Sequence, residues 1–168
     1  MPQQLKLELQ ETQETSVYLK RLPPEVAIDL WQVLKEMIRL SSTKRLLSDQ
    51  ELASIQRSVA TKSTVVWLIK RGEENCGLFL TSLQNCPITS EQTLLLHGLY
   101  GLSYLENTIW TIGLETLQEY CQERGIGKMV AYSNHPAVLR RLEGIGADTS
   151  YRRVELPVST KENKDEDK

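Results

Sequence analysis

Residues 120–148 read YCQERGIGKMVAYSNHPAVLRRLEGIGAD, in which a helix end, a strand and a complete helix follow one another. Gly125 is placed to end the first helix, because glycine readily adopts the left-handed conformation that closes helices. The short apolar run 128–133 predicts a strand of the core. Pro136 can begin the next helix without losing a hydrogen bond, and Gly146 can end it. This part of the chain therefore alternates between helix and strand.

Across the chain, the sequence predicts three helices besides the one that Pro136 begins, and several strands. A helix is expected after Pro24, with an apolar stripe formed by Val26, Leu30, Trp31, Leu34, Met37 and Ile38. A second helix opens at Ser48, because Glu51 three residues later gives the spacing of a capping box. A long helix is expected over 106–124. The apolar run 93–102 is expected to be a central strand buried on both faces. The other predicted strands are 16–22, 63–71, 75–83, 128–133 and 149–158.

The order of these elements predicts an α+β fold, with a central mixed α/β sheet flanked by helices. Only the later part of the chain alternates strand and helix, which argues against a doubly wound sheet. One domain is expected over 16–158. Residues 1–15 are expected to form a flexible N-terminal arm. Residues 159–168 contain no apolar side chain and are expected to be a disordered charged tail.

The composition narrows the class of protein. The 168 residues have a formal net charge of −2, with 40% hydrophobic and 25% charged residues. This balance is typical of a soluble globular domain and argues against a nucleic-acid partner held by bulk electrostatics. The sequence has no run of about 18 apolar residues that could span a membrane, and MPQQLKLELQETQET lacks the apolar core of a secretory signal. We therefore expect a protein that is kept inside a cell or packaged from one.

The cysteines give no sign of a metal site or of a disulfide framework. Cys76, Cys86 and Cys121 lie far apart, no CxxC pair occurs, and the chain has only two histidines. Reduced and buried thiols are expected, since a free cysteine usually packs as a small apolar residue. No bound metal is expected.

The order of elements resembles the GNAT superfamily of N-acetyltransferases, which use acetyl-CoA. The resemblance covers most of residues 16–158 and is most specific near their C-terminal end. In that superfamily a helix ending in Gly leads to a strand, then to an Asn-capped helix ending in Gly-Phe, then to a last strand. The corresponding segments here are QERG, KMVAYSN, HPAVLRRLEGIG and ADTSYRRVEL. The resemblance implies a GNAT-like sheet and, in an active protein, acetyl-CoA as the acyl donor.

Several positions depart from the pattern of active GNAT members. These typically carry Arg/Gln-x-x-Gly-x-Gly/Ala at the start of the long helix, where backbone amides bind the pyrophosphate of the cofactor. Residues 103–113 read SYLENTIWTIG instead, with the acid Glu106 where phosphates would lie and Gly113 as the single glycine. The tyrosine that often serves as the acid corresponds to Leu142, and the phenylalanine after the glycine corresponds to Ala147. These departures favour a degenerate member of the superfamily.

The resemblance places the candidate catalytic residues on 93–102. His97 could act as the base, because an imidazole exchanges protons near neutral pH, although a purely structural hydrogen bond to its ring is the simpler alternative. Tyr100 could donate a proton to the leaving thiolate, or could be an amphipathic residue at the edge of the core. Arg140 could bind a phosphate or lie on a solvated face. The candidate cofactor-binding residues are Leu99, Gly101, Leu102 and Arg140, the first three through backbone that would hold the pantetheine.

Two main classes of function remain open. The first is a GNAT-like structural or assembly component without catalysis, since the closing segment also resembles GNAT-like proteins of bacteriophages, some of them virion components. In that case the leucines of the arm, Leu5, Leu7 and Leu9, would add a strand to a protein partner or to another copy. The alternative is an active acetyl-CoA-dependent N-acyltransferase with His97 as base. A cellular adaptor built on the same fold is a third option. The expected location is the cytoplasm or a virion.

Overall fold

The computed structural model describes residues 16–41, 46–101, 107–133 and 136–150. The chain divides into two compact units, the first ending at Ala131 and the second beginning at Tyr132. In the described part of the chain the first unit holds the sheet, and the second holds one helix, α6 (Pro136–Gly144). The predicted arm, nearly all of the predicted last strand and the charged tail lie outside the described residues.

The first unit begins with strand β1 (Val17–Leu22) and continues with three helices. These helices are α2 (Pro24–Asp29), α3 (Trp31–Ser41) and α4 (Asp49–Ala60). Three strands follow in succession, and they are β2 (Val65–Arg71), β3 (Glu74–Asn85) and β4 (Gln92–Gly101). The unit ends with helix α5 (Asn107–Glu123) and strand β5 (Lys128–Ala131).

The five strands form one mixed sheet in the order β1-β2-β3-β4-β5. The first four strands are antiparallel to their neighbours, and β5 lies parallel to β4. The parallel pair is possible because α5 carries the chain back across the sheet between these strands. The hairpin from β2 to β3 turns at Gly72, whose φ of 58° is a conformation that glycine tolerates. This architecture confirms the predicted α+β class with a mixed sheet flanked by helices.

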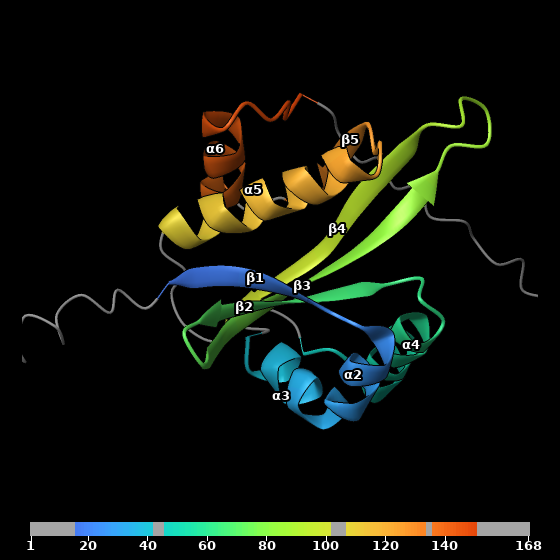
Figure 1. Ribbon diagram of the computed structural model, residues 1–168, viewed down its shortest axis with the longest axis vertical. Helices are drawn as coiled ribbons and strands as arrows, with labels where there is room; N and C mark the ends of the chain where they lie inside the picture. The colour runs from blue at the N-terminus through green and yellow to red at the C-terminus, as the bar shows by residue number, and fades with distance from the viewer. Residues whose placement is uncertain (1–15, 42–45, 102–106, 134–135, 151–168) are drawn as a thin grey trace, which may run out of the picture. The chain divides into compact units, whose positions relative to one another are not determined.

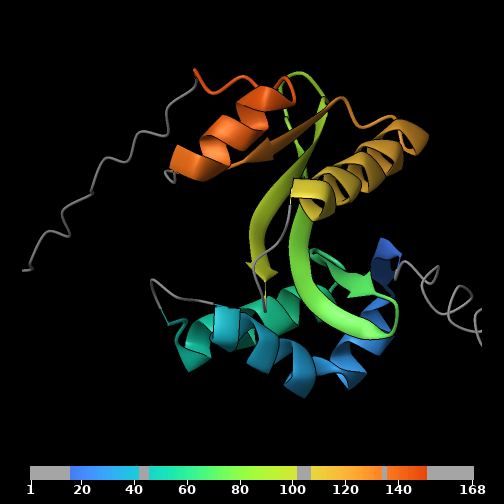
Figure 2. The same cartoon turned by 90° about the vertical axis from the view of Figure 1, so that its left-hand side faces the viewer.

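Each face of the sheet has its own hydrophobic core, with α2, α3 and α4 on one face and α5 on the other (Figures 1 and 2). The first core joins these three helices to sheet residues Leu22, Val66, Leu68, Leu78 and Leu80. The second core joins α5 to sheet residues Trp67, Ile69, Phe79 and Leu94. Alternate residues of β2 and β3 thus enter opposite cores, as the two-residue period of a strand requires.

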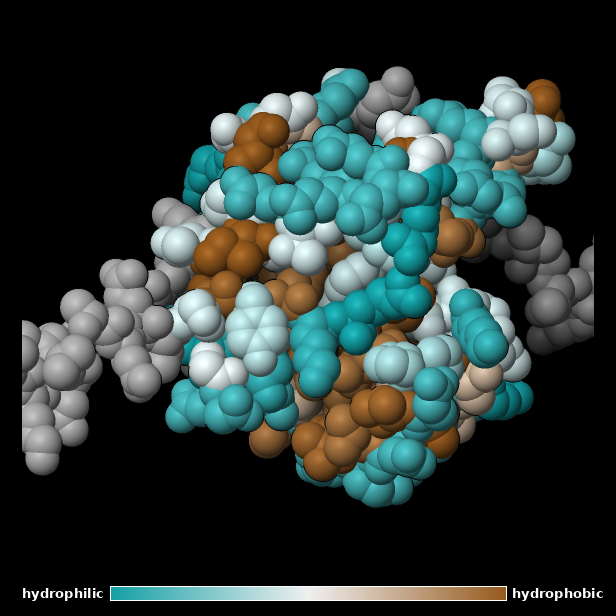
Figure 3. Space-filling view, in the orientation of Figure 1, coloured by the Kyte–Doolittle hydropathy of each residue, from teal (hydrophilic) through white to brown (hydrophobic). Residues whose placement is uncertain are grey.

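The helix predicted after Pro24 is in fact two helices, because the backbone leaves helical geometry at Leu30 (φ −88°, ψ 7°). The apolar stripe predicted for this segment is also wrong at two positions, since the side chains of Val26 and Leu30 are 38% and 40% exposed. Ala27 is the buried residue of α2, because its small side chain lets the helix pack closely against its neighbours. Figure 3 accordingly shows apolar surface over α2 and α3.

The capping box predicted for α4 is present. The Ser48 hydroxyl accepts a hydrogen bond from the Glu51 backbone N–H at 3.2 Å, and Glu51 Oε2 accepts one from the Ser48 backbone N–H at 2.8 Å. Both bonds satisfy amide groups that would otherwise be unpaired at a helix start. The box therefore fixes where α4 begins and how Glu51 is oriented.

One further expectation needs correction. β4 is buried on both faces only at Leu94 and Leu95, because β5 covers just four of its residues and the rest of the strand is half-buried or exposed. In the second unit, the apolar Ile145 is 50% exposed, since it follows the last helical residue. The predicted end of α6 is confirmed, because Gly146 has a φ of 90° and Ala147 N–H donates to the Leu142 carbonyl at 2.9 Å.

Candidate functional site

A β-bulge interrupts the pairing of β3 and β4 at His97. Leu80 pairs with Gly98, and Thr81 pairs with Leu96, so His97 is the additional residue on β4. A bulge bends its strand and redirects the side chain at that position, and bulges often lie beside active sites. The predicted catalytic histidine therefore occupies an irregular position of an otherwise regular strand.

The ladder between β4 and β5 stops at the same point. It contains four pairs, from Thr93 with Lys128 to Leu96 with Ala131. From His97 to Gly101, no strand of the described residues pairs with this edge of β4. A strand edge of this kind presents backbone N–H and C=O groups that can pair with an extended ligand. Within the described part of the chain, the second half of β4 thus pairs with β3 alone.

Aromatic side chains close to this edge of β4 in the sequence are Trp110 and Tyr104. Trp110 is half-buried and packs against the second core, and Tyr104 lies outside the described residues. The second core also holds Leu99, which is half-buried on β4. Packing against the second core therefore explains the position of Trp110.

A pocket of about 560 Å³ lies between α4 and the sheet at the bulge. Its lining residues are Leu47, Gln50, Glu51, Ser54, Ile55, Ser58, Thr64, Leu80 and His97. Five of these side chains come from one face of α4, with successive spacings of one and three residues that place them on adjacent turns. The pocket is therefore built by the capping-box helix on one wall and by the strands β3 and β4 on the other.

The hydroxyl groups on the helical wall act as hydrogen-bond acceptors toward the pocket. Ser54 donates its proton to the Gln50 carbonyl at 3.0 Å, and Ser58 donates its proton to the Ile55 carbonyl at 2.7 Å. The Ser54 oxygen also accepts a hydrogen bond from the Arg57 guanidinium at 3.2 Å, so a ligand could use only the remaining lone pairs of the two hydroxyls. Glu51 adds a half-buried carboxylate, and the described residues that line the pocket include no Lys or Arg. This part of the wall therefore favours a ligand that donates hydrogen bonds.

His97 is exposed and has a defined partner. Its Nε2 lies 2.7 Å from the Ser82 hydroxyl oxygen, a distance typical of a strong hydrogen bond. Ser82 is half-buried on β3, and its direct partner in the ladder is Leu95. The imidazole reaches across to Ser82 from the neighbouring strand. Sequence reasoning missed Ser82, because nothing in the local sequence marks a serine whose partner is selected by strand register.

Tyr100, the other predicted catalytic residue, packs against the first core. Its ring lies directly over Gly98, where a Cβ atom would come within 2.8 Å of it. Burial, and to a smaller extent the nearby Glu51 carboxylate, raise the pKa of the Tyr100 hydroxyl above its ordinary value. The hydroxyl therefore stays protonated over the physiological range, as a proton donor must.

The predicted cofactor-binding residues lie on two different elements. Leu99 and Gly101 follow the bulge on β4, where no second strand pairs with the edge. Leu102 lies outside the described residues. Arg140 is exposed on α6, in the second unit. The structure thus brings His97 and Tyr100 together with Leu99 and Gly101 on one strand, and the binding roles remain predictions.

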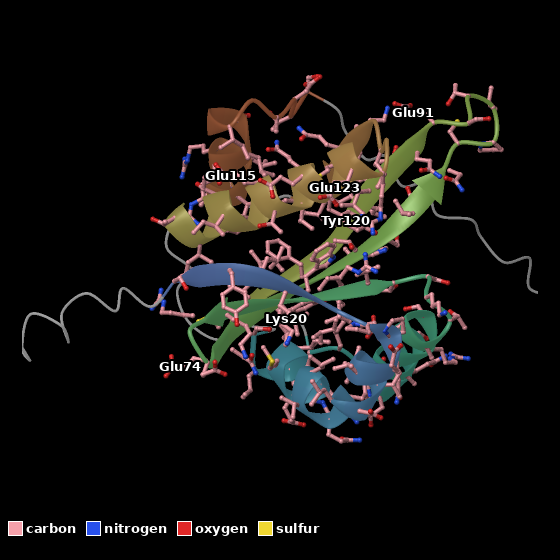
Figure 4. All side chains as sticks on the ribbon, viewed as in Figure 1. Lys20, Glu74, Glu91, Glu115, Tyr120 and Glu123 are labelled. Carbon is pink, nitrogen blue, oxygen red and sulfur yellow. The ribbon has the colours of Figure 1, made fainter. Side chains whose placement is uncertain are left out.

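A separate aromatic cluster fixes the C-terminal end of α5. Tyr120 points from α5 toward the sheet (Figure 4) and meets the Trp67 ring edge-on, with centroids 5.0 Å apart. The guanidinium groups of Arg124 and Arg21 lie 4.0 and 5.6 Å from the Tyr120 ring centroid, within the range of cation–π contacts. This cluster explains the position of α5 by packing.

The cysteines and the acidic residues provide no metal site in the described part of the chain. Cys76 and Cys121 are buried as expected, but Cys86 is only half-buried in the turn between β3 and β4. A hydrogen bond from the Thr89 hydroxyl, aided by backbone N–H groups, lowers the pKa of the Cys86 thiol. No helix among the described residues combines the length and apolar character needed to cross a bilayer.

No family model matches the sequence, and the search of curated proteins finds no match. The similarity of this chain to known proteins lies in its structure. A predicted acetyltransferase from Clostridium acetobutylicum, solved with acetyl-CoA, has a TM-score of 0.65 at 13% identity over 84% of this chain and 96% of that one. An aminoglycoside acetyltransferase from an uncultured soil metagenomic sample, solved with sisomicin, has a TM-score of 0.67 at 9% identity over 86% and 97% of the two chains.

A ribosomal-protein-alanine N-acetyltransferase from Brucella melitensis gives a similar result, with a TM-score of 0.64 at 11% identity over 85% of this chain and all of that one. At these identities the likeness shows the fold. The chain therefore has the GNAT-like fold that its order of elements predicted, and its activity has to be argued from its own residues.

Proposed function

We propose that this chain binds an acyl-CoA along the second half of β4 and transfers the acyl group to an amine held in the pocket between α4 and β4. The observation that carries the proposal is the coincidence of two features at one residue. The β5 ladder ends at Leu96, and the next residue, His97, is bulged and lines the pocket. An edge of β4 with which no strand of the described residues pairs thus adjoins a candidate base.

The strand edge supports a position for the acyl donor. Residues from His97 to Gly101 have backbone groups that could pair with the amide groups of an extended pantetheine, as the resemblance implies for this strand. Acetyl-CoA is the donor expected on this fold, and Leu99 and Gly101 are the residues expected to hold it. Backbone pairing would align the thioester with the mouth of the pocket.

The pocket wall supports the class of acceptor. Glu51, Ser54 and Ser58 offer oxygen lone pairs to a ligand that donates hydrogen bonds. His97 would accept the proton that the amine nitrogen loses as it attacks the thioester carbonyl. The same imidazole would return this proton to the CoA sulfur when the carbon–sulfur bond breaks, with Tyr100 as a second protonated donor on the strand. Protons and charge then balance without a metal.

The proposed site is weakest in the groups that would bind the phosphates of the cofactor. Residues 103–113 lack the glycine-rich pattern of active GNAT members, so at least two charge-assisted hydrogen bonds of about 1.5–3 kcal/mol each would be missing. This loss corresponds to roughly two to four powers of ten in affinity. Arg140 is the residue that we propose to compensate for part of it.

Release of free CoA thiol from acetyl-CoA in the presence of small amines tests the proposed activity. His97→Ala should lower kcat by about 10²–10⁴-fold, the usual contribution of a general base. The chain has one other histidine, His135, so His135→Ala serves as a matched control for the loss of an imidazole. Equal rates for wild type and His97→Ala would contradict the proposed role of His97.

A second candidate function is a structural or assembly component without catalysis. Gly113 favours it, because a Cβ atom there would lie 3.1 Å from the Phe79 ring, so that this glycine serves helix packing. In this case the arm with Leu5, Leu7 and Leu9 would mediate self-assembly or bind a protein partner, such as another component of a virion. Analytical ultracentrifugation of the full chain and of a triple Leu→Asp variant at these positions would test the arm, since self-assembly through it should be lost in the variant.

A further inference from the structure

We propose that Ser82 is a positioning residue for His97. It would hold the imidazole in the tautomer that carries its proton on Nε2, so that Nδ1 is the nitrogen that acts as base in the proposed acyl transfer. This inference rests on the proposed function for its catalytic meaning. The pairing itself rests on the geometry of β3 and β4.

The hydrogen bond joins two side chains that the sheet holds on one face. Leu80 and Ser82 are two residues apart on β3, so they point to the same side, and Leu80 lies in the first core. His97 lines the pocket on that side together with Leu80. The ladder pairs Ser82 with Leu95, and His97 lies two residues further along β4, diagonal to Ser82. The 2.7 Å distance therefore follows from strand geometry.

The chemistry of imidazole decides the direction of the hydrogen bond in an active site. A neutral imidazole has one N–H donor and one basic nitrogen. If the Ser82 hydroxyl donated to Nε2, the proton of the ring would be on Nδ1, and neither nitrogen could accept a proton directly from a substrate. If Nε2–H donates to the Ser82 oxygen, Nδ1 keeps its lone pair. Among the described residues no hydrogen bond to Nδ1 of His97 is present.

The same hydrogen bond would persist through a catalytic cycle. When Nδ1 takes a proton, Nε2 keeps its own proton and continues to donate to Ser82. The ring would then not have to reorient between the neutral and the charged form, which is the advantage of a preorganised site. His97 is exposed, so without Ser82 few contacts would hold its ring. Ser82 would therefore act on the orientation and tautomer of His97 without touching the substrate.

Nitrogen NMR of the imidazole rings tests the pairing without any activity assay. The chain has two histidines, so comparison with a His135→Gln variant assigns the signals of His97. The wild type should show His97 with its proton on Nε2, Ser82→Ala should show a mixture of tautomers, and Ser82→Thr should restore the wild-type pattern. A wild-type ring protonated on Nδ1, or a pattern unchanged in Ser82→Ala, would overturn the inference.

Steady-state kinetics then tests the role. Ser82→Ala should lower kcat by about 10–100-fold, the scale of a misplaced catalytic group, with the KM for acetyl-CoA unchanged. Ser82→Thr should retain most of the activity. Ser63→Ala is the matched control, because Ser63 is exposed and its hydroxyl lies 3.1 Å from that of Thr61, away from the pocket lining.

The outcomes separate the two proposals. Turnover that is normal in Ser82→Ala overturns the inference and leaves the proposed function standing. A wild type without turnover overturns the proposed function and the base role of Nδ1, whereas the NMR comparison then still decides whether Ser82 fixes the ring. An acyl group found covalently on Ser82 would also overturn the inference, because Ser82 would then be a nucleophile activated by His97.

Discussion

At the scale of single residues, Tyr100 links the core to the proposed site. Its ring packs on the first core and over Gly98, while its hydroxyl experiences the field of Glu51 across the pocket side of the sheet. Both burial and the negative charge disfavour the ionised phenolate, so the pKa of Tyr100 is raised. The residue is thereby a protonated donor and a packing element at once.

The raised pKa of Tyr100 predicts how stability changes with pH. The folded state holds the phenolic proton more tightly than the unfolded state, so this contribution is complete below the ordinary tyrosine pKa of about 10. It is lost as pH rises through the folded-state value. Urea unfolding at pH 8 and above pH 10 should therefore show a steeper fall in the free energy of unfolding for wild type than for Tyr100→Phe. Identical slopes for the two proteins would contradict the assignment.

His97 and Glu51 could both be recognised in the sequence, but for separate reasons. Glu51 was identified by the capping-box spacing after Ser48, and His97 as a titratable residue on an apolar strand. Their presence in one pocket could not be predicted, because the distance along the chain between α4 and β4 carries no information on which faces meet. Ser82 has no sequence signal at all, since its partner depends on the register of β3 and β4.

At the scale of elements, the close approach of β3 and β4 depends on Gly77. A Cβ atom at this position would lie 2.6 Å from the Tyr100 backbone oxygen and 3.2 Å from the Gly101 Cα atom. Backbone atoms cannot yield as the end of a flexible side chain can, so any larger residue must push the strands apart. The end of β4 that we propose to bind the acyl donor is therefore held in place by a glycine on the neighbouring strand.

Gly77→Ala should lower the free energy of unfolding by about 1–3 kcal/mol, the usual cost of overpacking, and it should also weaken acetyl-CoA binding because it displaces Gly101. Chemical denaturation measures the first effect and calorimetry the second. Gly144→Ala is the matched control, since a Cβ atom at Gly144 on α6 meets nothing within 4 Å and should cost no stability. Equal stability of Gly77→Ala and wild type would show that the strands can separate freely.

The elements that local chemistry specifies were the ones that could be predicted from sequence. The capping box at Ser48, the turn at Gly72 and the helix end at Gly146 each require particular residues at particular spacings. The break at Leu30 and the bulge at His97 have no such signature, because both arise from how elements pack together. The stripe predicted from residue spacing is wrong at Val26 and Leu30, because the chain forms two helices here and α2 buries the small Ala27.

At the scale of the whole molecule, the fold is shared with acetyltransferases that are 9–15% identical in sequence. The resemblance that predicted it rests on the order of elements together with a few residues of the C-terminal segment, such as the glycine that ends the long helix and the proline that begins the last one. The fold cannot decide between an enzyme and a scaffold, because the same framework supports both. What distinguishes them is whether the acyl donor is bound.

Isothermal titration of the full chain with acetyl-CoA, and separately with free CoA, measures that binding directly. We predict heat with both ligands, at an affinity below that of GNAT proteins with the glycine-rich pattern. Arg140→Ala should weaken binding by about tenfold or more, as expected for the loss of one charge-assisted hydrogen bond. Arg39→Ala is the matched control, because Arg39 on α3 pairs with Glu36 and Asp49. The absence of heat at millimolar ligand would contradict acyl transfer and would favour the structural role.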